Sequence, residues 1–331
     1  MVSPTQQQLS PDDVGAVVAD ALGVAPSRCT VLSGGEFAAV WRIDLRDGRA
    51  VVLKVGPASG VGLLQYEAGM IPAEAEYLRL VAAGAPDVPV PRVLAHGDAG
   101  LGGDWVLTTL LSGTALPDVV ASGADTSEVR RGLGSALASV HRISGDRFGY
   151  TGDRPQAGTW REALRAVVES LLADGAAWGV ADDVLPARRV RAALDRNDHV
   201  LDAVRRPALV HFDLWDGNVL AAPDDTGTWR LSGLVDGERY LFGDPLVDLV
   251  SPALFRRIED EPDHPLLDGL ARATGTPVVL DDSARTRLSL YRMWLSVLMV
   301  AEMPSRGRAG DADRRAFLSG LLHAELTRLG A

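Results

Sequence analysis

The sequence predicts an α+β fold of two lobes, a small antiparallel sheet followed by a larger and mostly helical lobe. Closely spaced strand patterns fill the first third of the 331 residues, and long helical patterns dominate after about residue 112. A turn-rich connector at 109–113 separates the two regions. We therefore expect a first lobe over residues 1–111 and a second lobe over 112–331.

The first lobe begins with a helix and continues with strands joined by short turns. Residues 10–24 form an amphipathic pattern, with Ser10 or Asp12 near its start as a cap. Strand patterns follow at 29–45, where a Gly-Gly turn separates two strands, and at 49–56. Connections this short are typical of an antiparallel sheet.

A second helix and two further strands complete this lobe. Residues 71–84 predict a helix, since Pro72 suits its first turn and Gly84 its end. A proline-rich connector at 86–98 leads into a strand, and another strand pattern occupies 104–116.

The second lobe is expected to be built from helices around one hairpin. The clearest helical patterns before the hairpin lie at 127–143, 159–180 and 188–204. The apolar segment 288–303 is interrupted by Arg292 and closed by Glu302, and it is shorter than the ~18–20 apolar residues that span a membrane. It predicts a buried or pocket-lining helix, and we expect no membrane partner.

Charge and cysteine content limit the partners. The formal net charge of −11 argues against a broad basic face for nucleic acid. We interpret the negative charge as a feature that keeps the protein soluble. The alternative is that it attracts a cationic substrate. Cys29 is the only cysteine, and the N-terminal residues have no signal-peptide pattern. We therefore expect a cytoplasmic protein.

Three polar side chains stand at the ends of two apolar segments in the hairpin. Asp213 and Asn218 lie in HFDLWDGN, and Asp236 begins DGE after the next apolar segment. One carboxylate can act as a base, while the amide and the second carboxylate supply oxygen ligands to a metal. This is the set that phosphoryl transfer from a nucleotide requires.

These residues resemble the catalytic loop and metal-binding aspartate of the aminoglycoside phosphotransferase and choline-kinase-like family. The resemblance extends, in order, over roughly residues 30–255: it includes VVLKVG, AEAEYLRLVAAGAPDVPVPRVL, WVLTTLLSGTAL and GDPLVDL. It implies a bilobal protein-kinase-like fold that binds ATP and Mg²⁺ between the lobes.

The resemblance also implies a role for individual residues. Asp213 is expected to be the catalytic base that takes the proton of the substrate hydroxyl, and Asn218 and Asp236 are expected to bind Mg²⁺. Lys54 would contact the α- and β-phosphates. Glu74 would pair with Lys54; Glu76 and Glu67 are the alternative partners, and we favour Glu74.

A nucleotide-covering loop is expected between the first two strands, although it is not the G-x-G-x-x-G of protein kinases. The residues at its position are Ser33, Gly34, Gly35, Glu36 and Phe37. A Gly-Gly pair alone is also the mark of an ordinary hairpin turn. Thr109 to Leu111 would offer backbone groups to the adenine, and Leu53 and Val106 would form part of its apolar surroundings.

Several neighbouring residues have structural explanations. His211 is expected to support the loop, and Asp248 to anchor it by hydrogen bonds. Many family members have Gly where this chain has Phe212, so the loop is expected to pack differently. Glu238 has two equally weighted roles, as an acid behind the site or as part of a substrate pocket.

Four aromatic residues of the second lobe, Trp160, Trp178, Tyr291 and Trp294, are expected in the core rather than against a ligand.

The sequence thus predicts a small-molecule O-phosphotransferase. The acceptor would be a hydroxyl of an antibiotic or amino sugar, and a choline-, fructosamine- or homoserine-like metabolite is the alternative. Use of GTP in place of ATP stays open. The other hypotheses are a non-catalytic nucleotide-binding pseudokinase, a metal-dependent hydrolase using His211 and Asp213, and a protein kinase. The protein kinase is disfavoured because the segment after Asp236 leaves little room for an activation loop.

Overall fold

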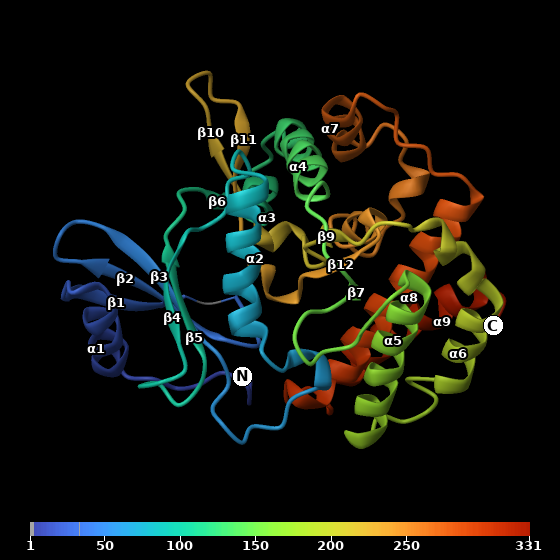
Figure 1. Ribbon diagram of the computed structural model, residues 1–331, viewed down its shortest axis with the longest axis horizontal. Coiled ribbons are helices and arrows are strands. Elements are labelled where there is room, and N and C mark those ends of the chain that lie inside the picture. Colours follow the sequence, from blue (N-terminus) through green and yellow to red (C-terminus); the bar gives the residue numbers. More distant parts are fainter. Residues whose placement is uncertain (1–2, 33) are drawn as a thin grey trace.

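The computed structural model describes residues 3–32 and 34–331, and it has the predicted two-lobed α+β arrangement (Figure 1). The first lobe contains an antiparallel sheet in the order β1-β2-β3-β5-β4. Its strands are β1 (Pro26–Leu32), β2 (Ala39–Leu45), β3 (Ala50–Val55), β4 (Val93–Gly97) and β5 (Trp105–Thr109). Each strand pairs with a partner close in sequence, which is why short turns signalled this sheet.

Helix α1 (Pro11–Leu22) covers one face of the sheet. Ser10 caps it, because its hydroxyl accepts a hydrogen bond from the Asp13 amide at 3.1 Å. Val14 and Val18 are fully buried against a cluster of strand residues that includes Ile43 and Leu53. This cluster is separate from the main core of the protein.

Helix α2 (Met70–Gly84) covers the opposite face. Side chains alternate between the two faces of a strand, so Lys54 lies on the face opposite Leu53 and Val55 and turns toward α2. Leu53 is packed with α1 instead, so the expectation that it surrounds an adenine is wrong. Val106, which pairs with Lys54 across the strands, belongs to the core on the α2 side.

The connection between the lobes is fixed by a second sheet. Strand β5 ends at Thr109, and β6 (Thr114–Ala115) pairs with β10 (Val219–Pro223) of the second lobe. The boundary expected between residues 111 and 112 lies between these strands. Gly113 has φ 148°, and a Cβ atom there would lie 2.3 Å from the Ser232 hydroxyl oxygen, so only glycine fits this crossing point.

The second lobe is mainly helical. Its helices are α3 (Leu116–Ala121), α4 (Ser127–Val140), α5 (Trp160–Ala177), α6 (Ala187–Asn197), α7 (Pro265–Thr274), α8 (Asp282–Ser305) and α9 (Ala312–Arg328). Its remaining strands are β7 (Phe148–Gly149), β8 (Gln156–Ala157), β9 (Ala208–Val210), β11 (Trp229–Leu234) and β12 (Leu241–Gly243). They form two small sheets, in the orders β11-β10-β6 and β8-β7-β12-β9.

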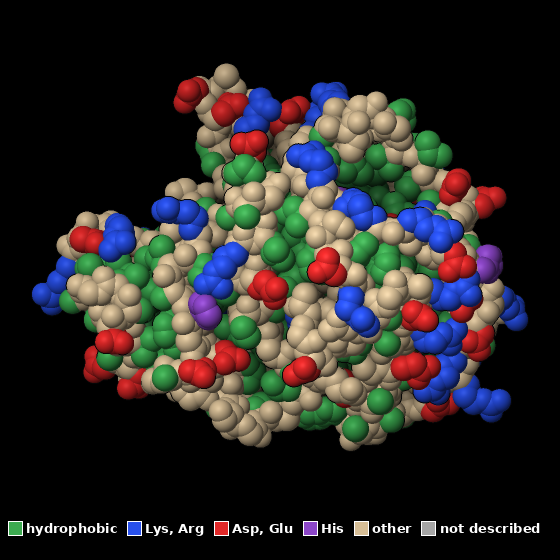
Figure 2. All heavy atoms as spheres, in the orientation of Figure 1, with side chains coloured by type: hydrophobic (Ala, Val, Ile, Leu, Met, Phe, Trp, Pro, Cys, Tyr) green, Lys and Arg blue, Asp and Glu red, His purple; other side chains and the backbone are tan. Residues whose placement is uncertain are grey.

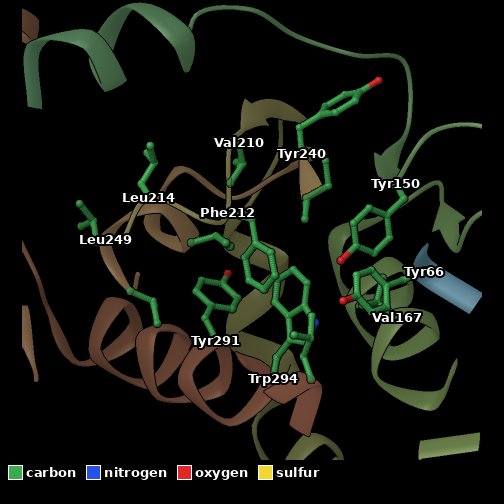
Figure 3. Close-up of a cluster of buried hydrophobic side chains, with 14 of the residues drawn as sticks. Tyr66, Tyr150, Val167, Val210, Phe212, Leu214, Tyr240, Leu249, Tyr291 and Trp294 are labelled. Carbon is green, nitrogen blue, oxygen red and sulfur yellow. The ribbon is translucent and has the colours of Figure 1, made fainter. Parts of the chain in front are cut away.

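Helix α8 carries much of the core, as the apolar pattern at 288–303 predicted. Trp160, Tyr291 and Trp294 are buried, and the Trp160 ring contacts each of the other two edge to face. In Figure 3 Tyr291 and Trp294 lie next to Phe212. Trp178 differs from the expectation, because it ends α5 at the surface and is 37% exposed.

The second lobe also differs from the sequence prediction at the helix expected over 188–204. Helix α6 ends at Asn197, and a 3₁₀ segment continues from Asp198 to Ala203. The Asn197 amide donates to the carbonyl oxygens of Ala193 at 2.8 Å and Leu329 at 3.0 Å, which ties the helix end to the C-terminal residues.

On the side drawn in Figure 2, basic side chains do not gather into one broad face. Acidic and basic side chains are interspersed there over the second lobe. Many of them are paired, for example Arg191 with Glu169 and Arg165 with Asp195, both at 2.8 Å. Among the described residues, no helix is both long enough and apolar enough to cross a membrane.

Candidate active site

The loop between β9 and β10 is held by one buried carboxylate. Asp248 accepts hydrogen bonds from the backbone amides of His211 at 3.1 Å and Phe212 at 2.7 Å. It also contacts the His141 ring at 2.9 Å, and its own side chain is fully buried. Asp248 therefore makes the anchoring hydrogen bonds that were expected of it.

Phe212 gives this loop an unusual conformation. Its φ is 72°, in the left-handed region that side chains other than glycine adopt at a cost of about 1–3 kcal/mol. The ring stacks on Trp294 with 4.2 Å between centroids and 12° between planes (Figure 3). This packing, together with the two hydrogen bonds to Asp248, offsets the backbone strain.

His211 is a structural residue of the loop. Its Nε2 contacts the Val235 carbonyl at 3.0 Å, and its Nδ1 accepts a hydrogen bond from the Asp213 amide at 3.3 Å. Burial lowers its pKa, which favours the neutral ring that this pairing requires. Both ring nitrogens are thus committed to the loop. Residues 3–32 and 34–331 contain no group of three or more His, Cys, Asp or Glu side chains that could hold a metal ion.

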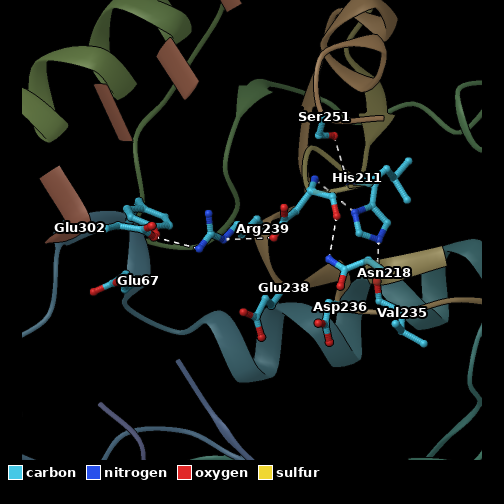
Figure 4. Close-up of polar contacts among 12 residues, drawn as sticks. Glu67, His211, Asn218, Val235, Asp236, Glu238, Arg239, Ser251 and Glu302 are labelled. Carbon is cyan, nitrogen blue, oxygen red and sulfur yellow. Dashed lines mark hydrogen bonds and ion pairs between the residues drawn. The ribbon is translucent and has the colours of Figure 1, made fainter. Parts of the chain in front are cut away.

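Asn218 and Asp236 lie close together at the end of the hairpin (Figure 4), and the Asn218 side chain is bonded to the backbone of Asp213. The Asn218 side-chain nitrogen donates to the Asp213 backbone carbonyl at 2.7 Å. The Asn218 backbone carbonyl accepts from the Val235 backbone amide at 3.1 Å. Asp236 follows directly and has φ 64°. Both carboxylates keep part of their side chains exposed.

Lys54 connects the first lobe to this group. Its Nζ lies 2.8 Å from both carboxylate oxygens of Glu74 on α2, and it also pairs with Asp236. Glu74 is therefore its helix partner, as the sequence favoured. Glu76 is exposed and accepts a hydrogen bond from the Thr151 hydroxyl at 3.3 Å. Glu67 pairs with Arg306 instead of Lys54.

Helix α2 lies directly against the turn that carries Asp236. A Cβ atom on Gly237 would lie 2.1 Å from the ring of Tyr77, so the residue after Asp236 must be glycine for α2 to approach this closely. The close approach brings Glu74 and Asp236 to the same lysine.

The charges around Lys54 are unbalanced. Glu238 lies 3.9 Å from Nζ, so three carboxylates share one ammonium group. Burial raises the pKa of Glu238 to about 8, and the carboxylates of Glu74 and Asp236 add to the rise. Even without the charge of Glu238, the carboxylates of Glu74 and Asp236 exceed the single charge of Lys54, and this excess fits a cation.

The oxygen donors nearby suit Mg²⁺. The Asn218 amide uses its nitrogen for the Asp213 carbonyl, which leaves its oxygen for a ligand. The carboxylate of Asp236 lies beside Asn218 and is partly exposed. Amide and carboxylate oxygens are the ligands that Mg²⁺ prefers, and it takes only one or two from protein when phosphate oxygens supply others.

A polar wall beside Asp213 was not foreseen from the sequence. Arg239 places its Nε 3.6 Å from the Asp213 carboxylate and donates through a terminal nitrogen to Glu302 at 2.8 Å (Figure 4). Tyr66 also binds Glu302, and its ring lies 5.7 Å from the Arg239 guanidinium carbon. The signal available was Glu302 itself, a charged residue that closes an apolar helix and so needs a buried partner.

The expected nucleotide-covering loop lies between β1 and β2, and Ser33 is outside the described residues. Gly34 has φ 133°, which suits glycine, and Gly35 offers its carbonyl to the Gln6 amide at 2.8 Å. Phe37 is buried and faces Arg306 of the second lobe. These residues form a loop at the lobe boundary, and its role over the phosphates stays a prediction.

The residues expected to contact the adenine end β5. The Thr109 amide donates to the Arg92 carbonyl at 2.9 Å, and its hydroxyl accepts from the Arg92 amide at 2.9 Å. Both groups are thus occupied within the first lobe. The Leu111 side chain lies beside Gly233 of the second lobe. Contact between residues 109–111 and a base also stays a prediction.

Solved structures show that this arrangement is the protein-kinase-like fold. A putative fructosamine-3-kinase from Thermobifida fusca superimposes with a TM-score of 0.67 at 22% identity, covering 96% of this chain and 100% of that chain. An aminoglycoside phosphotransferase APH(4)-Ia, solved as a ternary complex with AMP-PNP and hygromycin B, gives 0.66 at 22% identity over 96% and 99%. At these identities the likeness shows the fold.

Sequence comparison gives the family. Residues 28–290 match the model of the phosphotransferase enzyme family APH, so the chain belongs to this family. The resemblance predicted from the motifs is thereby confirmed.

Two curated relatives act on different acceptors. A probable ketoamine kinase of Lactiplantibacillus plantarum is 27% identical over 237 residues, 68% of this chain and 73% of its own. The viomycin phosphotransferase of Streptomyces vinaceus is 30% identical over 192 residues, 56% of this chain and 62% of its own.

Proposed function

We propose that the protein uses ATP and Mg²⁺ to transfer a γ-phosphoryl group to a hydroxyl of a small, amine-bearing molecule. The observation that carries this proposal is the meeting of Asp213, Asn218 and Asp236 with the Lys54–Glu74 pair in a chain of the APH family. The complex of a structural neighbour with AMP-PNP supports a nucleoside triphosphate as donor. We expect ATP rather than GTP.

In the proposed reaction, Asp213 accepts the proton of the acceptor hydroxyl as its oxygen bonds to the γ-phosphorus and the bond to the β-phosphate oxygen breaks. Its backbone is fixed by the Asn218 amide and the His211 ring, so the carboxylate is held in place before the acceptor arrives. Lys54 would hold the α- and β-phosphates, and Glu74 keeps its ammonium group in position.

Asn218 and Asp236 would hold Mg²⁺, which in such sites neutralises charge on the phosphate oxygens. Such a site works by positioning and charge neutralisation, without a covalent intermediate.

The charges beside Asp213 support an amine-bearing acceptor. Asp213, Glu302 and Glu67 are three carboxylates that share the guanidinium groups of Arg239 and Arg306. One negative charge is left over, and a protonated amine next to the reacting hydroxyl would balance it. Our first choice of acceptor is an antibiotic or amino sugar.

A ketoamine is the second candidate, because relatives of that type appear in both the sequence and the structure comparisons. It also carries an amine and hydroxyls, so the charge argument fits either class. An ATP-dependent enzyme with one unpaired cysteine, Cys29, suits the reducing cytoplasm, and we place the protein there as part of this proposal.

The proposal is tested by release of ADP from Mg-ATP with a panel of hydroxylated antibiotics, amino sugars and ketoamines. The Asp213→Asn variant serves as the control for contaminating activity. We expect turnover with at least one amine-bearing acceptor and much less with its deaminated analogue. Binding of Mg-ATP without turnover on any acceptor would instead favour the pseudokinase hypothesis.

A further inference from the structure

Arg306, in the turn that follows α8, is surrounded by three groups from different parts of the protein. It is 5% exposed. Its guanidinium carbon lies 5.4 Å from the centre of the Phe37 ring, and a terminal nitrogen pairs with both Glu67 and Glu302, the latter at 3.2 Å. An arginine enclosed this way offers a planar array of donors and a face that stacks on an aromatic ring.

Each of the three groups leads to a different part of the active site. Phe37 belongs to the loop between β1 and β2. Glu67 ends the 3₁₀ segment just before α2, the helix that carries Glu74. Glu302 binds Arg239, which lies beside Asp213 (Figure 4). Arg306 thus contacts the loop between β1 and β2 and the segment before α2, and through Glu302 and Arg239 it is linked to Asp213.

The loop between β1 and β2 depends on outside contacts for its position. It lacks the glycine pattern of protein kinases, and its backbone carbonyls are held by the N-terminal segment. Thr5 donates its hydroxyl hydrogen to the Glu36 carbonyl at 2.8 Å, and Gln6 donates to those of Gly35 at 2.8 Å and Ala38 at 3.1 Å. Arg306 supplies the buried contact from the second lobe.

A second arginine in the same turn provides a natural comparison. Arg308 pairs with Glu36 of the loop, but its side chain is 39% exposed. A solvent-exposed pair contributes little to a defined geometry, because water and salt compete with it. The buried Arg306 and the exposed Arg308 therefore touch neighbouring residues of one loop with very different expected consequences.

We propose that Arg306 is a positioning residue that sets the loop of residues 34–38 over the nucleotide phosphates and ties that loop to α2 and α8. The inference rests on the proposed function, since it presupposes that this loop covers a nucleotide. Arg306 does not itself touch substrate in this account. It acts through Phe37 and Glu67, so its loss misplaces the loop and weakens contacts to the β- and γ-phosphates.

The test compares the affinities of AMP-PNP and AMP, both with Mg²⁺, by calorimetry on the full chain. We expect Arg306→Gln to weaken AMP-PNP binding by about tenfold or more and AMP binding by less than about twofold. Arg306→Lys, which keeps the charge, should recover part of the loss. Arg308→Gln should bind both ligands within about twofold of the wild-type protein.

A general structural role would lower both affinities together, so an unchanged AMP-PNP to AMP ratio in Arg306→Gln overturns the inference. If that variant does not fold, Phe37→Leu removes the ring and leaves the ion pairs intact. A selective loss of AMP-PNP affinity in Phe37→Leu supports the proposal, and wild-type affinity contradicts it. Failure of the wild-type protein to bind Mg-AMP-PNP would overturn the proposed function as well.

Discussion

The charged groups on the two sides of the active site are balanced differently. Around Lys54, three carboxylates face a single ammonium group. Beside Asp213, three carboxylates share two guanidinium groups, those of Arg239 and Arg306. With every carboxyl group counted as ionised, the excess is two negative charges around Lys54 and one beside Asp213.

The difference indicates what each side is built to receive. Burial and the neighbouring carboxylates of Glu74 and Asp236 raise the pKa of Glu238 to about 8, and the divalent cation proposed beside them would favour its ionised form. An excess of one charge suits a single protonated amine. These two excesses match the ligands of the proposed function, which are a metal ion near Lys54 and a protonated amine near Asp213.

Replacement of the base should produce the largest effect. We expect Asp213→Asn to lower kcat by about 10³-fold, because a positioned general base contributes roughly 10²–10⁴-fold. Affinity for Mg-AMP-PNP should stay near that of the wild-type protein, since Asp213 is not expected to bind the nucleotide. Steady-state kinetics with calorimetry separates the two quantities, and near wild-type turnover would refute the base assignment.

Two glutamates on α2 provide a matched pair for the nucleotide side. Glu74→Gln should lower kcat/KM for ATP by roughly a hundredfold, because removing one partner of a buried, hydrogen-bonded pair costs about 2–5 kcal/mol. Glu76→Gln, two residues away on the exposed side of the helix, should change it by less than about twofold. Equal effects of the two substitutions would contradict the role given to the Lys54–Glu74 pair.

On the acceptor side, Glu302 predicts a dependence of stability on pH. Burial raises its pKa to about 6, although Arg306 beside it opposes the rise. Between pH ~4.5 and 6 this carboxyl binds a proton in the folded state but not in the unfolded state, so its contribution to stability falls as pH rises and is lost above pH ~6. The total loss is about 2 kcal/mol.

Urea unfolding of the wild-type protein and Glu302→Gln at pH 4.5 and 6.5 tests this sign. The free energy of unfolding of the wild-type protein should fall by about 2 kcal/mol relative to the variant over this range. A difference that stays constant, or that changes in the opposite direction, would show that Glu302 does not titrate as described.

The smallest effect is expected within the catalytic loop. At most buried positions glycine is less favourable than alanine, but Phe212 has φ 72°, where glycine is unstrained. We expect both Phe212→Gly and Phe212→Ala to lose the stacking on Trp294, and the glycine variant to be more stable by about 1 kcal/mol. Thermal unfolding shows which of the two variants is more stable. A more stable alanine variant would contradict the strain assigned to this position.

The sequence identified the groups that local motifs bring together. Asp213 and Asn218 are five residues apart in one loop, and Asp236 follows β11, whose last residue pairs with Val219 at the start of β10, so hairpin geometry brings them near one another. The short turns of the first lobe and the apolar pattern of α8 likewise indicated their elements. Leu53 packs with α1 rather than on the side of Lys54, because strand alternation sends neighbouring side chains to opposite faces.

The polar wall could not be deduced in the same way. Glu302 meets Arg239 across 63 residues of sequence, and Arg306 meets Glu67 across 239. Neither contact follows from spacing or periodicity, because each depends on how α8 packs against the rest of the protein. The sequence marked Glu302 only as the charged residue that closes an apolar segment, without identifying its partner.

The central claim is that Asp236 and its neighbours form a magnesium-dependent nucleotide site. The most direct test is calorimetric titration of AMP-PNP into the wild-type protein and Asp236→Asn, each with Mg²⁺ and with EDTA. We predict that Mg²⁺ strengthens binding to the wild-type protein by at least about tenfold and that the variant loses this gain. An affinity that is the same in all four titrations would contradict the account.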